Sequence, residues 1–190
     1  LIAHGLPVAP CDIPPLFIGG TMEGVFETAK SLGADLPDDW VARFYEKMFA
    51  RLDEGVPLIP GILELIEALE AEQVAIWVAS NGPMEKMRRT LGPSGLWDRL
   101  QGRILSREHF TPKPDPAMIL HAMAETGAQV EETVFIDDSP TGCRAGINAG
   151  VTTYGFAAET DAAQLSEVGA TVFHSMADLH PLLLPRYAAQ

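Results

Sequence analysis

The segment from Val134 to Gly150 constrains the fold more than any other part of the sequence. An apolar triplet, residues 134–136, runs directly into Asp137 and Asp138, which a Ser-Pro pair and a run of small residues follow. This pattern predicts a short buried strand and then a helix with the proline in its first turn. Open α/β sheets bind ligands where strands end and helices begin. The acid pair is therefore a candidate binding site.

Two interpretations of Asp137 and Asp138 are open from this segment alone. One acid, or the following Ser139, could simply cap the helix. Two carboxylates about 4–6 Å apart repel each other by about 3–4 kcal/mol at an effective dielectric of about 20. A helix N-terminus stabilises each charge by only about 0.3–1 kcal/mol. A cation beside the pair would offset this difference, so a cation site is the alternative to a cap.

Composition excludes several classes of function. The 190 residues include 13 basic and 26 acidic side chains, for a net charge of −13, which disfavours nucleic-acid and anionic-membrane partners. No uncharged apolar run reaches the about 20 residues of a membrane span, and no signal peptide is visible. Cys11 and Cys143 are isolated, which favours reduced thiols and a cytoplasmic location. We expect a monomer or a weak homodimer.

The hydrophobic pattern changes near residue 56. Residues 1–56 are predicted to form a helical cap, and residues 57–190 an α/β core in which strands alternate with helices. Such alternation predicts a parallel sheet that helices cover on both faces. The expected helices span residues 22–32, 38–52, 62–72, 83–91, 114–126, 140–149 and 161–168. The expected strands span residues 74–79, 103–106, 134–136, 151–156 and 171–174.

Two other predicted strand ends carry polar chemistry. Ser80, Asn81 and Gly82 follow the strand at residues 74–79, where they could bind an anion or merely cap the next helix. Lys113 lies between two prolines, which would aim its ammonium at an anion; a solvated lysine is the alternative. Together with the acid pair, these groups could bind a phosphoryl group and Mg²⁺, which prefers carboxylate oxygens.

These motifs resemble those of the haloacid dehalogenase superfamily, in its capped phosphatase and β-phosphoglucomutase-like branch. The family's second motif matches residues 79–82, its third matches Lys113-Pro-Asp-Pro, and its fourth matches residues 134–150. The resemblance implies a Rossmann-like α/β core with a small helical cap.

The resemblance also implies a role for each candidate residue. Ser80 would bind phosphate with help from Asn81, and Lys113 would steady the nucleophile and the phosphoryl oxygens. Asp138 would bind Mg²⁺ directly, and Asp137 would do so directly or through water. The cap's substrate loop would fall near Gly20 and Thr21.

One motif of the family is missing. Its Asp-x-Asp strand supplies the nucleophile and the general acid/base, and Asp12 follows prolines rather than an apolar strand. In the family this strand lies between those that correspond here to residues 74–79 and 134–136. Since each buried unpaired backbone group costs about 1–3 kcal/mol, we expect a segment upstream of Leu1 to supply both the strand and its aspartate. A noncatalytic pseudoenzyme is the alternative if translation begins near Leu1.

The expected function is a Mg²⁺-dependent phosphatase acting on a small phosphorylated metabolite of the sugar phosphate or phosphoglycolate type, through a phosphoaspartate. A β-phosphoglucomutase-like phosphomutase and a 2-haloacid dehalogenase are alternatives. Many mutase-type members have a basic residue just after the glycine that corresponds to Gly20, where this chain has Thr21. Dehalogenation needs no Mg²⁺, so the acid pair disfavours it.

Overall fold

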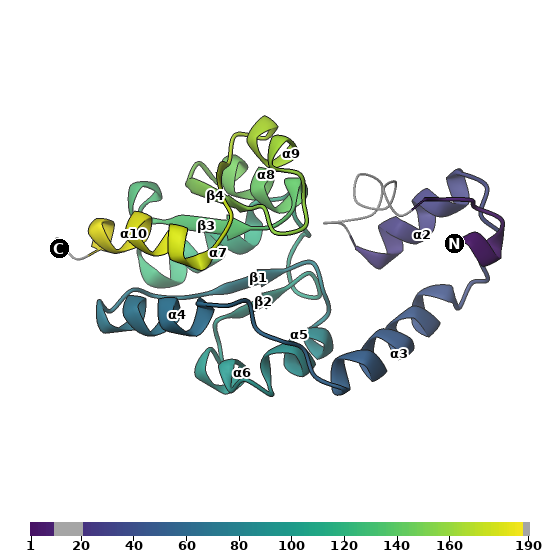
Figure 1. Cartoon of the computed structure of the whole chain (residues 1–190), viewed down its shortest axis with the longest axis horizontal. Helices are drawn as coiled ribbons and strands as arrows, with labels where there is room; N and C mark the ends of the chain where they lie inside the picture. Colours follow the sequence, from purple (N-terminus) through teal and green to yellow (C-terminus); the bar gives the residue numbers. More distant parts are fainter. Residues whose placement is uncertain (10–20, 188–190) are drawn as a thin grey trace.

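The computed structural model describes residues 1–9 and 21–187 (Figure 1). Its strands are parallel, as the alternating pattern predicts, and they are flanked by helices. The strands are β1 (Val78–Ser80), β2 (Ile104–Ser106), β3 (Val134–Asp137), β4 (Thr152–Phe156) and β5 (Thr171–Phe173). Within the described chain, β1 pairs with β2, and β3, β4 and β5 form a separate sheet in that order.

The helices of residues 57–187 follow the predicted alternation, with two additions. They are α4 (Ile62–Ala71), α5 (Met84–Leu91), α6 (Leu96–Arg99), α7 (Ala117–Thr126), α8 (Pro140–Ala149), α9 (Ala162–Glu167) and α10 (Met176–Tyr187). The short α6 and the longer α10 were not predicted. Single 3₁₀ turns occur at Ile2–His4 and Val130–Glu132. No helix in the described ranges has both the length and the apolar character that a membrane crossing requires.

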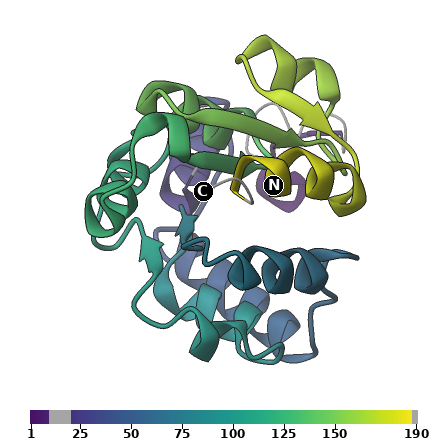
Figure 2. The ribbon, with the colours of Figure 1, turned by 90° about the vertical axis from the view of Figure 1, so that its left-hand side faces the viewer.

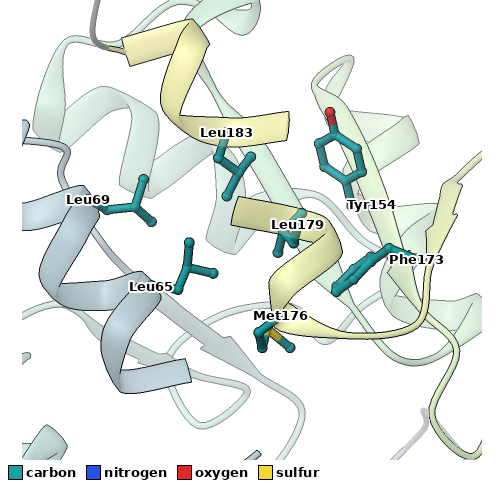
Figure 3. Close-up of a cluster of buried hydrophobic side chains, with 7 residues drawn as sticks. All are labelled: Leu65, Leu69, Tyr154, Phe173, Met176, Leu179 and Leu183. Carbon is teal, nitrogen blue, oxygen red and sulfur yellow. The ribbon is translucent and has the colours of Figure 1, made fainter. Parts of the chain in front are cut away.

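The largest apolar cluster joins α4 and α10 to the β4–β5 side of the sheet (Figure 3). Leucines from the two helices meet there, and aromatic side chains from β4 and β5 complete the contact. Its buried members are Leu65, Leu69, Tyr154, Phe173, Met176, Leu179 and Leu183. A second cluster packs α7 and α8 against β3, and its buried members are Ile119, Ala145, Ala149 and Val151. Helices therefore pack around the sheet that ends in the acid pair.

The free edges of β1 and β3 face a cleft. Its volume is about 1000 Å³, and its lining includes residues 73–79 and 132–136. Figure 2 shows the two groups of strands on either side, with β3 and β4 in green, β5 in yellow-green, and β1 and β2 in blue-green. The strand predicted at residues 74–79 begins only at Val78, because residues 74–77 have no strand partner in the described chain.

The N-terminal helices, α2 (Met22–Ser31) and α3 (Trp40–Asp53), lie to one side of the strands, with α3 against α5 (Figure 1). They have an apolar cluster of their own, built on Leu6, Ala29, Ala34 and Leu36. The Trp40 and Phe44 rings stack with their centroids 5.8 Å apart. The predicted division into a cap and a core near residue 56 stays a prediction.

Candidate active site at the strand ends

Ser80 ends β1, and its side chain folds back onto the following turn. The Gly82 N–H donates to Ser80 Oγ at 3.0 Å. The next helix, α5, has Pro83 as its N-cap, without a side-chain capping bond. Its first N–H, that of Met84, donates to Glu108 Oε2 at 2.9 Å. Neither Ser80 nor Asn81 therefore serves as the helix cap, which was the alternative to a ligand-binding role.

Asn81 clamps the backbone of Lys113. Its Nδ2 donates to the Lys113 carbonyl oxygen at 2.9 Å, and its Oδ1 accepts from the Lys113 N–H at 2.7 Å. The pair of bonds holds the loop before α7 against the end of β1. This positioning role was missed from the sequence, because the two residues are 32 positions apart and no local pattern links them.

Lys113 extends from this clamp to the ends of both sheets. Its Nζ donates to the Ala79 carbonyl oxygen of β1 at 3.1 Å and to Asp137 Oδ2 of β3 at 2.6 Å. The side chains of Lys113 and Asp137 are only 9% and 8% exposed. The ammonium also lies 5.6 Å from the centre of the Phe135 ring. Lys113 is thus a buried, paired lysine rather than a solvated one.

The second oxygen of Asp137 is held by the start of α8. Asp137 Oδ1 accepts from the Ser139 N–H at 3.0 Å and from the Ser139 hydroxyl at 2.7 Å. Ser139 itself caps α8, accepting the Gly142 N–H at 3.0 Å. A Cβ at position 142 would collide with the Asp137 carboxyl group, so glycine lets the helix approach it. The helix cap is Ser139, and neither aspartate is needed for that purpose.

Asp138 is held less tightly and stays exposed to solvent. Its backbone carbonyl oxygen accepts from the Thr160 hydroxyl at 2.7 Å. Partial desolvation, followed by repulsion from Asp137, raises the pKa of its carboxyl group above the usual value. Both causes disfavour the negative charge, and the attraction of a bound cation would offset them. Among residues 1–9 and 21–187, no group of three His, Cys, Asp or Glu side chains could hold a metal.

The predicted substrate loop is described only in part. Gly20 lies outside the described residues, and Thr21 caps α2 by accepting the Gly24 N–H at 3.1 Å. The next residue but one, Glu23, forms a two-bond ion pair with Arg107, at 2.7 and 2.9 Å. Arg107 also donates to the Tyr45 hydroxyl of α3 at 3.2 Å.

The Arg107 backbone completes the connection to the site, because its N–H donates to the Ser80 carbonyl oxygen at 3.2 Å. One arginine therefore ties α2 and α3 to the end of β1. Nothing in the sequence around Arg107 indicated this contact, since its partner Glu23 is 84 residues away.

Comparison with known proteins places this geometry in a family. A sequence model of the haloacid dehalogenase-like hydrolases matches residues 15–156. The chain belongs to this family. The predicted superfamily is therefore confirmed.

Curated relatives of this haloacid dehalogenase-like chain are phosphatases. A 6-phosphogluconate phosphatase of Escherichia coli is 29% identical over 152 residues, which cover 79% of this chain and 67% of the relative. A phosphoglycolate phosphatase of Rhodospirillum rubrum is 30% identical over 109 residues, covering 55% of this chain and 45% of the relative. The chain thus spans about half to two thirds of the length of these relatives. These relatives belong to the enzyme class expected for this chain, the phosphoric monoester hydrolases.

Solved structures confirm the haloacid dehalogenase fold. A hydrolase from Pseudomonas syringae superimposes with a TM-score of 0.80 and 26% identity, covering 96% of this chain and 86% of that one. A family hydrolase from Deinococcus radiodurans, with bound phosphate and sodium, gives a TM-score of 0.75 and 28% identity over 97% of this chain and 84% of that one. The parallel α/β fold predicted from the sequence is therefore correct.

Proposed function

We propose that this chain is part of a Mg²⁺-dependent phosphatase that hydrolyses a small phosphorylated metabolite of the sugar phosphate or phosphoglycolate type. The observation that carries the proposal is the position of Lys113 Nζ, which lies between the end of β1 and Asp137 at the end of β3. The phosphatase relatives add support. The chemistry is phosphoryl transfer to an aspartate, followed by hydrolysis of the phosphoaspartate.

Ser80 and Lys113 would bind the phosphoryl group. A serine hydroxyl at a strand end can donate to one phosphoryl oxygen, and the ammonium can neutralise the charge that develops on the others. Asn81 would act through Lys113, because both of its bonds to that residue hold the backbone that carries the ammonium. Thr21 and Gly20 stay candidates for substrate contacts from the cap.

The two aspartates of the acid pair differ in how each could bind Mg²⁺. Desolvation and then repulsion from Asp137 raise the pKa of Asp138, and the exposed side of the residue leaves room for a hydrated cation. Both oxygens of Asp137 already accept bonds from Lys113 or Ser139. We therefore assign direct contact to Asp138 and contact through water to Asp137. When bound, Mg²⁺ would neutralise phosphoryl charge.

The nucleophile is proposed to lie on a further strand between β1 and β3. The cleft there is lined by the free edges of both strands. Lys113 bridges the end of the cleft at which β1 and β3 terminate. A strand that filled the cleft in the parallel direction would end beside Lys113, where an aspartate could attack a phosphoryl group held by Ser80. No strand of residues 1–9 and 21–187 occupies this position.

The test is hydrolysis of phosphate monoesters by the full-length protein. We expect Mg²⁺-dependent release of phosphate, which EDTA abolishes, and loss of activity by at least about 100-fold in Asp138→Ala. Asp98→Ala, which removes an exposed carboxylate on α6, is the matched control. Full activity of Asp138→Ala would contradict the metal assignment. Chloride release from a 2-haloacid without Mg²⁺ would indicate a dehalogenase instead.

A further inference from the structure

Lys86, in the first turn of α5, lies near Ser80 and belongs to none of the matched family motifs. Its side chain folds back across Gly82. A Cβ built on Gly82 would lie 2.9 Å from Lys86 Cδ, 3.3 Å from Ser80 Oγ and 3.8 Å from Lys86 Nζ. The serine hydroxyl and the lysine ammonium are therefore on the same side of the loop. The missing Cβ of Gly82 leaves the space in which the lysine lies.

The ammonium of Lys86 forms no close ion pair in the described part of the chain. Over residues 1–9 and 21–187, its ammonium makes no ion pair within 4.0 Å, although the side chain is half-buried. The other cations of α5 behave differently, since Arg88 and Arg89 both pair with Glu85. A half-buried ammonium without a close ion pair among these residues is available to an anion that comes from outside.

Lys86 and Lys113 reach the end of β1 from different segments, α5 and the loop before α7. Lys113 is fixed between β1 and β3 by its bonds to Ala79 and Asp137, on the side of the cleft. Lys86 reaches Ser80 from α5, across Gly82. The phosphoryl group of a substrate bound to Ser80 and Lys113 would thus leave Lys86 available for another part of the same molecule.

We propose that Lys86 is a specificity-determining residue that binds a second anionic group, a carboxylate, on the phosphate ester. This inference rests on the proposed phosphatase function and names the class of substrate, a phosphorylated acid. A lysine suits the task because its ammonium offers three donors and a full charge to a carboxylate. Its weak attraction to Asp138, also at the mouth of the site, is consistent with this position.

The test compares two esters that differ in one group. 6-Phosphogluconate carries a carboxylate where sorbitol 6-phosphate carries a hydroxymethyl group. In full-length protein, Lys86→Gln should lower kcat/KM for 6-phosphogluconate about 10- to 100-fold and leave that for sorbitol 6-phosphate within about threefold. Lys86→Arg should restore most of the loss. Arg88→Gln, which removes a paired charge from the outer face of the same helix, should change neither value.

Ligand-induced stabilisation provides a second readout that needs no turnover. 6-Phosphogluconate should raise the Tm of the wild type more than sorbitol 6-phosphate does, and Lys86→Gln should remove that difference. An equal loss on both esters would show that Lys86 binds the phosphoryl group, and no loss on either would show that it binds nothing. Both results overturn the inference.

The two proposals can fail separately. Hydrolysis of both esters, with the same preference in the wild type and in Lys86→Gln, would refute the role of Lys86 and leave the phosphatase. Absence of hydrolysis, with a Tm difference that depends on Lys86, would refute the phosphatase and support the anion site. If neither hydrolysis nor a Tm difference that depends on Lys86 is observed, both proposals are refuted.

Discussion

Lys113 Nζ lies 2.6 Å from Asp137 Oδ2 and, through its bond to Ala79, joins two sheets that share no backbone pairing in the described chain. The side chains of both charged partners are less than a tenth exposed. A buried pair of this kind is costly to break on one side only, because the remaining charge has no partner. Structural and chemical roles therefore coincide in one ammonium.

Lys113→Gln is expected to lower the free energy of unfolding by about 3–5 kcal/mol, since it leaves the Asp137 carboxylate buried and unpaired. The double variant Lys113→Gln/Asp137→Asn should recover part of this loss. Urea denaturation at pH 7 measures both values. A double variant no more stable than the single one would show that the ion pair is not the cause. Activity should be lost in both variants, because each lacks the ammonium.

Asp138 is expected to make stability fall as pH rises. Its pKa is raised in the folded state, so folding favours the protonated carboxyl group. The contribution is fully present below the unfolded pKa of about 3.9 and is lost as pH rises through the higher folded-state value. In EDTA at pH 7, Asp138→Asn should therefore raise Tm, by about 1–2 °C after solvent screening.

The same variant also tests the metal. Millimolar Mg²⁺ should raise the Tm of the wild type and leave that of Asp138→Asn unchanged, as thermal scans at pH 7 would show. Equal stabilisation of both proteins would place the cation elsewhere.

Cys143 is expected to resist thiol reagents in the folded protein. It is fully buried on α8, and its Sγ–H donates to the Asp137 carbonyl oxygen at 3.7 Å. Burial, and then repulsion from the nearby carboxylates, raises the pKa of the thiol to about 12. At pH 8 only about one thiol in ten thousand is ionised. In a Cys11→Ser background, labelling with a disulfide reagent should be slow and should accelerate in urea; rapid labelling without urea would contradict this burial.

Arg107 is expected to control how tightly α2 is held to the core. Arg107→Gln removes the bonds to Glu23 and Tyr45, both of which bridge distant segments. Since Glu23 is about half exposed, the loss should be only about 1 kcal/mol, equal to roughly a fivefold rise in local opening. Amide hydrogen exchange of residues 22–31 measures it. Arg43→Gln, which breaks an exposed pair with Asp39 at the start of α3, should leave this exchange unchanged.

Local patterns were enough to locate the strand ends. The acid pair, Ser80 and Lys113 each stand in a segment whose own residues predict a strand end or a helix start, so their placement followed from sequence. The hydrogen bonds among these residues could not be predicted in this way. Asn81 holding Lys113, and Arg107 reaching Glu23, depend on pairs of residues far apart in the chain, and neither partner has a local signature.

The length of β1 shows a second limit of prediction from sequence. Residues 74–77 have the apolar character of a strand, yet they line the cleft without a strand partner in the described chain. An apolar pattern predicts burial, whereas a strand also needs a neighbour for its backbone bonds. The sequence also left two candidates for the cap of α8, because Asp138 and Ser139 are both good capping residues.

The packing of α10 sets the order in which the chain can fold during synthesis. Leu179 and Leu183 complete an apolar cluster whose other helix, α4, is made more than 100 residues earlier (Figure 3). During synthesis, Leu65 and Leu69 therefore lack this helical partner until the residues in between have been made. At about 5–20 residues per second, this interval lasts from several seconds to tens of seconds.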